Sequence, residues 1–201
     1  MRIKKISLTE QIGSVLKGAP KEGLCLKDLV NTLEYRAHAI VIIILCLPFC
    51  TPIPLPGASS IIAVFIFFIA GAILFRLPPY LPFGWESRRF DCGRLLKIYE
   101  RAEPWLRKLE LVLRPRWLVL AAHPAAVRVH GLLIILTAVL LALPAPPGGN
   151  ALPGLAIMAL CLALIEEDGV LSVVGFGLVA VNFVLFSALY YFVIEWAMSY
   201  F

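Results

Sequence analysis

An apolar stretch interrupted by prolines restricts the fold of this chain more than any other feature of its sequence. Residues 40–75 contain no charged side chain, yet Pro48, Pro52, Pro54 and Pro56 fall within them. Proline removes a backbone N–H donor and breaks helices, and an unpaired carbonyl group in an apolar environment costs free energy. The stretch therefore predicts two helices joined by a break that other parts of the protein must cover.

The composition is typical of a membrane protein. The chain has 201 residues, of which 61% are hydrophobic and 15% charged, with a mean hydropathy of +0.90. Apolar segments follow one another at residues 37–50, 58–75, 131–143, 152–165 and 170–201. The first, third and fourth of them would reach roughly 20 Å as helices, less than the hydrocarbon core of about 30 Å. The N-terminus has no continuous apolar run typical of a signal peptide, so we expect the first apolar segment to insert uncleaved.

The proline-rich break occurs twice. Two stretches share one order of elements, which is an arginine, a histidine two residues later, an apolar run, a proline and a Leu-Pro-Gly triplet. They begin at Arg36 and Arg128, and their triplets are residues 55–57 and 152–154. Two short signatures in the same order predict an internal repeat of helical hairpins that dip into the bilayer or just cross it. The alternative is that the prolines only end two helices at an external loop.

The distribution of charge predicts the orientation. All 18 lysines and arginines occur at or before Arg128, and the formal net charge is +5. Because these charges flank apolar runs, they indicate the cytoplasmic side of a membrane rather than a site for nucleic acid. We therefore expect a multi-pass membrane protein with a cytoplasmic N-terminus, whose two hairpins return to the cytoplasm and whose last helix ends outside.

These segments divide the chain into parts with different expected roles. Residues 1–36 are predicted to form cytoplasmic amphipathic helices, and residues 37–75 the first membrane hairpin. Residues 76–128 are predicted to form a basic interfacial linker that binds anionic lipid headgroups. Residues 129–201 hold the second hairpin and a long C-terminal transmembrane helix. The expected fold is thus an all-α polytopic membrane protein with two proline-broken helical hairpins.

The breaks themselves are the first candidate site. Irregular backbone at membrane depth is tolerated only where protein buries it or water reaches it, and paired interrupted helices point to a transport site. The residues expected to line the breaks are prolines, glycines and an amide, namely Pro52, Pro54, Pro56, Gly57, Pro144, Pro146, Asn150, Pro153 and Gly154. Asn182, further along the chain, is expected to form a hydrogen bond between helices.

An acidic turn is the second candidate site. Glu166, Glu167 and Asp168 interrupt the apolar C-terminal part of the chain. They are consistent with a solvated turn, with a cation or proton site, or with a partner for arginines of the linker. We favour the ion pair, because Arg114 and Arg116 are predicted on the same side of the membrane and arginine binds carboxylates bidentately.

Each R-x-H element places a histidine at the start of an apolar segment. The residues concerned are Arg36 with His38, and Arg128 with His130. We expect these histidines to be interfacial anchors, with proton handling as the alternative, since the ordinary pKa of histidine lies near neutrality.

Motifs for catalysis and metal binding are absent from the sequence. It contains no G-x-S-x-G, no P-loop, no dinucleotide-binding fingerprint and no H-E-x-x-H. Its cysteines and histidines do not have the spacing of a metal site. We therefore expect no enzymatic activity, no cofactor and no metal.

Five motifs occur in a fixed order along the chain. They are the R-x-H start, LPFCTPIPLPG at 47–57, KLELVLRPRW at 108–117, LPAPPGGNALPG at 143–154 and EDG at 167–169. Taken in this order, they resemble the ExoD family of bacterial inner-membrane proteins. The similarity runs from about residue 24 to residue 192. The sequence departs from the family pattern before Arg36, where Tyr35 stands at the usual acidic position and Glu34 lies one residue earlier.

The resemblance implies a place in the bacterial inner membrane and a link to exopolysaccharide synthesis and alkali tolerance. With the broken hairpins, it suggests transport of an ion or an envelope precursor. The alternative is a non-catalytic accessory that organises exopolysaccharide machinery. Expected partners are membrane lipids and exopolysaccharide synthesis proteins but no nucleic acid. The sequence is compatible with a homo-oligomer as well as with a monomer.

Overall fold

The protein is a helical bundle in the computed structural model. The structure describes Gly13, Leu33 and residues 24–25, 35–50, 57–78, 89–90, 99–101, 103–104, 116–146 and 148–199. Its helices are α3 (Tyr35–Cys46) with the 3-10 turn η1 (Leu47–Cys50), α4 (Ala58–Phe75), α6 (Leu118–Ala121), α7 (Pro124–Ala142), α8 (Ala151–Glu166) and α9 (Gly169–Met198). Two short strands, β1 (Leu24–Cys25) and β2 (Arg89–Phe90), pair in antiparallel orientation.

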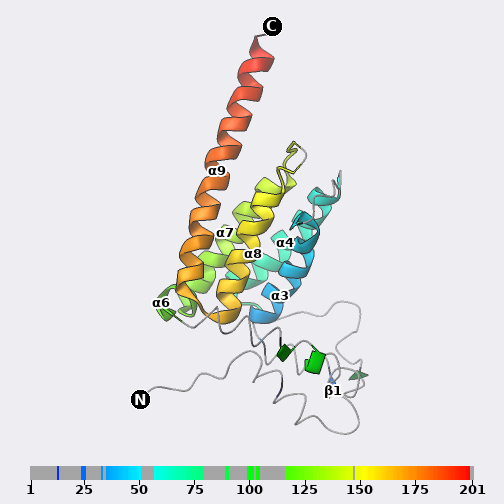
Figure 1. The fold of residues 1–201 in the computed structure, drawn as a ribbon, viewed down its shortest axis with the longest axis vertical. Coiled ribbons are helices and arrows are strands. Elements are labelled where there is room, and N and C mark those ends of the chain that lie inside the picture. The colour runs from blue at the N-terminus through cyan, green and yellow to red at the C-terminus, as the bar shows by residue number, and fades with distance from the viewer. Residues whose placement is uncertain are drawn as a thin grey trace.

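The two broken helix pairs pack crosswise. Helix α3 packs on α8 and α4 packs on α7, so each helix of the first pair contacts a helix of the second. Helix α9 runs along α8 and α7 and extends well beyond the bundle (Figure 1). The helical architecture predicted from the sequence is confirmed.

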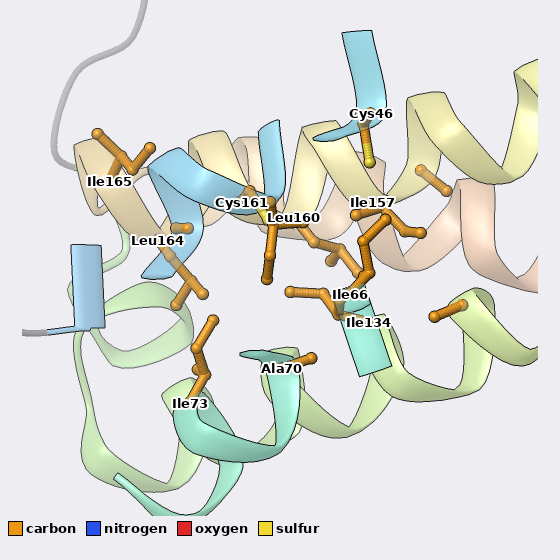
Figure 2. Packing of buried hydrophobic residues seen from close by; sticks show 14 of the residues in the cluster. Cys46, Ile66, Ala70, Ile73, Ile134, Ile157, Leu160, Cys161, Leu164 and Ile165 are labelled. Atoms are coloured by element: carbon orange, nitrogen blue, oxygen red, sulfur yellow. The ribbon is translucent and has the colours of Figure 1, made fainter. Parts of the chain in front are cut away.

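Apolar side chains fill the space between the four bundle helices. Ile42, Ile66, Ile134, Leu160 and Leu164 come from α3, α4, α7 and α8, and each has no solvent exposure. Ile66 and Ile134 point toward each other from opposite helices (Figure 2). The centre of the bundle is therefore a packed core in this conformation.

The outer surface is apolar as well. Phe68 on α4, Val184 and Ile194 on α9 and Leu132 on α7 are exposed, with 69% of Phe68 and 68% of Val184 accessible. An apolar surface of this extent marks contact with lipid or with another protein. Helices α7 and α9 are long and apolar enough to cross a membrane by length and composition, whereas the apolar helices Tyr35–Phe49, Ser59–Phe75 and Ala151–Glu166 are shorter.

Helix α7 is longer than the sequence predicted. The apolar run at residues 131–143 was expected to be too short to span, but α7 begins at Pro124 and has 19 residues, or about 28 Å. His123 caps its first turn, because its Nδ1 accepts a hydrogen bond from the Ala125 N–H, and proline suits the first helical position. Arg128 and His130 fit into the helix, since the first is exposed and the second is hydrogen-bonded inside the bundle. The prediction that this segment is too short to cross a membrane was wrong.

Other boundaries are close to those predicted. Helix α4 has the bounds expected from its apolar run, and α8 begins one residue early, which places Pro153 and Gly154 inside its first turn. The β1–β2 ladder is an exception to the all-α prediction, and two-residue strands have no periodicity that a sequence could reveal. The N-terminal amphipathic helices and most of the interfacial linker lie outside the described residues.

Candidate functional site

The turn between α8 and α9 is formed by Glu167 and Asp168, which cap the two helices. Glu167 ends α8 in the left-handed conformation, with φ 53° and ψ 38°. Asp168 then caps α9, and its Oδ1 accepts hydrogen bonds from the N–H groups of Val170 at 2.9 Å and Leu171 at 3.4 Å. The neighbouring carboxylates therefore have different partners, and the Asp168 carboxylate stabilises the start of α9.

A buried ion pair ties this turn to the first helix of the bundle. The Arg36 guanidinium lies 2.9 Å from Glu167 Oε1, and the Tyr35 hydroxyl donates to the same oxygen at 3.2 Å. The side chains of Arg36 and Glu167 are only 12% and 6% exposed. The acidic turn thus forms an ion pair with Arg36 of the R-x-H element, whereas the sequence predicted linker arginines as its partners.

Arg116 meets the same turn through its backbone. Its carbonyl accepts a hydrogen bond of 2.7 Å from the Gly169 N–H, and it forms a parallel bridge with Asp168. The Arg116 side chain is exposed. Arg114, the other predicted partner, lies outside the described residues.

His130 is inside the bundle. Its ring has no exposure, Nδ1 lies 2.8 Å from the Ala126 carbonyl oxygen, and Nε2 lies 3.0 Å from the Ser172 hydroxyl on α9. A carbonyl oxygen can only accept, so Nδ1 is the donor in that contact. His38 is also buried, at 8% exposure, and its Nδ1 has no partner. The expectation that both histidines are interfacial anchors was wrong, because both side chains are buried.

At the opposite end of the bundle, side chains bind the carbonyl groups around the second break. Ser60 on α4 donates to the Ala142 oxygen at 3.0 Å, and Tyr190 on α9 donates to the Pro144 oxygen at 3.0 Å. Asn182 Nδ2 donates to the Leu152 oxygen on α8 at 3.3 Å, which confirms the predicted bond between helices. The break is thus partly covered by hydroxyl and amide donors from other helices.

Two amide oxygens at this break have no hydrogen-bond partner. They are Asn182 Oδ1, whose residue has no exposure, and Asn150 Oδ1 at the start of α8. The Asn182 orientation is fixed, because Nδ2 faces the carbonyl oxygens of Leu178 and Leu152, and an exchange of O and N would place oxygen against oxygen. Asn150 is two residues from Leu152, so both amides belong to one short region of the fold.

The first break lies beside the second. A Cβ atom at Gly154, in the first turn of α8, would lie only 3.0 Å from the Phe49 Cβ in η1. Gly57 begins α4 at a φ of 79°, which favours glycine. Pro144 and Pro146 lie between α7 and α8, as expected. Pro52, Pro54 and Pro56 lie outside the described residues.

Comparison with known proteins decides the family. Residues 8–188 match the family described as "Exopolysaccharide synthesis, ExoD". The chain belongs to the ExoD family. Protein ExoD of Rhizobium meliloti (strain 1021) is 28% identical over 187 residues, which cover 92% of this chain and 78% of that protein. An uncharacterized protein of Synechocystis is 30% identical over 151 residues, covering 75% of this chain and 71% of the relative.

No solved structure matches this ExoD-family chain. The family links it to exopolysaccharide synthesis. Among the residues that the structure describes, no group of three or more His, Cys, Asp and Glu side chains could hold a metal ion. The polar groups of the candidate site are therefore a buried ion pair at the arginine-rich end of the bundle and unpaired amide oxygens at the end with the helix breaks.

Proposed function

We propose that the chain is a multi-pass protein of the bacterial inner membrane that serves exopolysaccharide synthesis by moving an ion or an envelope precursor at its two helix breaks. The observation that carries this proposal is that the breaks meet at Phe49 and Gly154 in the first turn of α8. The same turn follows Asn150 and binds Asn182 through the Leu152 carbonyl, and both amide oxygens are unpaired. The family supplies the process. The proposal includes no catalytic step.

The proposed membrane placement is supported by the exposed apolar surface of the bundle and by arginines gathered at one of its ends. Arg36, Arg76, Arg116 and Arg128 lie where α3 and α7 begin and where α4 and α8 end, at the end of the bundle shown lowest in Figure 1. The positive-inside rule makes that end cytoplasmic. The breaks then face the outer half of the membrane, and α9 runs outward to its C-terminal end. The crosswise packing of α3 on α8 and α4 on α7 supports an internal repeat.

Cysteine labelling tests this orientation. In a cysteine-less background, a membrane-impermeant maleimide added to intact cells is expected to label Ser199→Cys but not Trp117→Cys. Trp117 and Ser199 are both exposed, so burial does not limit either reaction. Permeabilised cells should label both variants equally. Labelling of Trp117→Cys in intact cells would place the arginine-rich end outside and overturn the topology.

Transport through the bundle requires the helix pairs to separate, because the core between them is filled. Asn182 is placed to respond to that movement. It lies roughly 20 Å along α9 from its first residue, and it holds α9 to the start of α8. An unpaired oxygen at this depth is stabilised by a hydrogen bond from water or a substrate or by contact with a cation, since a buried polar group without a partner costs free energy.

The variant Asn182→Leu separates a transport role from a structural one. Leucine is close in size. It removes the unpaired oxygen but also the hydrogen bond to the Leu152 carbonyl, and because these two effects oppose each other, thermal stability in detergent is expected to change little. Flux is expected to fall strongly. The measurement uses proteoliposomes with an internal pH dye and, in parallel, a fluorescent phospholipid whose outer-leaflet label is quenched. Ser60→Ala, which removes a more exposed hydroxyl at the same break, is the control.

The accessory role is the second candidate, and the filled apolar core favours it. A protein that only organises other enzymes needs no path through its bundle. Wild-type proteoliposomes without proton or lipid movement, together with co-purification of a polysaccharide synthase, would support this candidate. Equal flux from wild-type and Asn182→Leu protein would instead remove Asn182 from any transport path.

A further inference from the structure

Two arginines lie at a similar level at the arginine-rich end of the contact between α4 and α7. The helices are antiparallel, since Ser60 near the start of α4 binds the last residue of α7, and Gly131 lies against Leu74 at the other end. Arg76 follows Leu74 by two residues, and Arg128 precedes Gly131 by three. At about 1.5 Å of rise per residue, the two arginines are level to within a helical turn.

The contact between α3 and α8 has an ion pair at the corresponding place. There Arg36, near the start of α3, binds Glu167, which ends α8 with φ 53° and ψ 38°. Arg76 ends α4 in nearly the same backbone conformation, with φ 54° and ψ 40°. The α4–α7 contact thus has an arginine where the α3–α8 contact has a glutamate.

These two arginines have no counter-charge in the described part of the chain. Both side chains are exposed, and the salt bridge found among the described residues joins Arg36 to Glu167 instead. Neighbouring like charges repel, and an anion that binds both would remove the repulsion. Arginine is suited to phosphate, because its planar fork of N–H donors matches the phosphate oxygens.

Apolar side chains flank the arginine pair. Phe75 is 72% exposed, Leu77 is 55% exposed and Val129 is 46% exposed. A charged pair bordered by exposed apolar groups matches a molecule with a phosphate head and an acyl chain. We propose that Arg76 and Arg128 bind the phosphate group of an anionic ligand, and that an anionic membrane lipid is its source. The lipid source relies on the proposed membrane location, whereas phosphate binding itself does not depend on transport.

Lipid titration of the full-length protein tests the site. The protein is held in phosphatidylcholine nanodiscs or a neutral detergent, and short-chain phosphatidylglycerol is added while bound lipid is counted by native mass spectrometry. Arg76→Gln and Arg128→Gln are each expected to weaken binding about tenfold, the size of one hydrogen bond between charged groups. Arg76→Lys should keep part of the affinity. Arg116→Gln, which removes an exposed arginine at the same end, should change it less than twofold.

The outcomes separate the sources of phosphate. Binding of phosphatidylglycerol that inorganic pyrophosphate does not displace, and that the double variant loses, supports the lipid. Binding of pyrophosphate that the double variant loses supports the same site with a soluble ligand. Equal losses in Arg116→Gln and in the double variant would show general charge attraction and overturn the proposal. Absence of binding by both probes to the wild-type protein would also overturn it. The flux measurements described above do not enter this result.

Discussion

Replacing Arg36 by glutamine is expected to destabilise the protein by up to about 3–5 kcal/mol, because the buried Glu167 carboxylate then loses its ion pair with Arg36 and keeps the Tyr35 hydroxyl. Glu167 is 6% exposed and lies 2.9 Å from the guanidinium, so water cannot readily replace that contact. The change also releases the start of α3 from the end of α8. Thermal or denaturant unfolding in detergent, followed by helical circular dichroism, measures the effect.

A double-mutant cycle separates this ion pair from its surroundings. Glu167→Gln alone leaves a buried arginine and should also be destabilising, whereas the double variant should lose clearly less than the sum of the two. The coupling is expected because residues in direct contact do not behave additively. Arg101→Gln, at an exposed arginine, is the control and should change stability by about 0–1 kcal/mol. Additive losses would show that Arg36 and Glu167 do not stabilise each other.

Gly131→Ala is expected to destabilise the bundle by about 1–3 kcal/mol through overpacking. A Cβ atom at this position would lie 2.8 Å from the Leu74 backbone nitrogen and 3.0 Å from its Cα. Backbone atoms cannot rotate away as a flexible side chain can, so α4 and α7 would have to move apart. Loss of the glycine should therefore lower the unfolding temperature in detergent.

Gly71→Ala, in α4, provides the matched comparison. Nothing lies within 4 Å of a Cβ at Gly71, so the new methyl group meets open space. Alanine is the better helix former by about 1 kcal/mol, and stability should stay equal or rise. Destabilisation of the same size in both variants would mean that the close contact at Leu74 does not limit packing.

The sequence predicted the helices best where the apolar runs end in strong signals. Helix α4 follows Gly57 and has the expected bounds, and α9 begins directly after the Asp168 cap. Helix α7 was predicted too short, because Arg128 and His130 made its first turns look like a linker. Inside the helix, His130 is held by a hydrogen bond with Ser172, and Arg128 lies at an exposed position at the end of the bundle. A single sequence reveals neither of these.

The sequence predicted an ion pair at the acidic turn, but it did not predict which arginine takes part. The acidic turn was expected to pair with the linker arginines Arg114 and Arg116, whereas the ion pair joins Glu167 to Arg36. The choice follows from the packing of α3 on α8, a contact between segments distant in the chain. Asn182 was predicted to form a hydrogen bond between helices. That its Oδ1 is unpaired follows only from the structure, in which Nδ2 faces the carbonyl oxygens of Leu152 and Leu178.

Helix α9 is anchored at one end and projects at the other, so in the proposed membrane location the second break is sensitive to bilayer thickness. Its 30 residues extend about 45 Å, against about 28 Å for α7. Its base is held by the Arg116–Gly169 hydrogen bond, while residues 191–198 are exposed. A helix longer than the hydrocarbon core tilts, and more so in a thin bilayer. A tilt about the fixed base displaces Asn182 and Tyr190, the α9 residues that hold the carbonyl groups of Leu152 and Pro144. Thinner membranes should therefore loosen the cover of the second break, and thicker ones should tighten it.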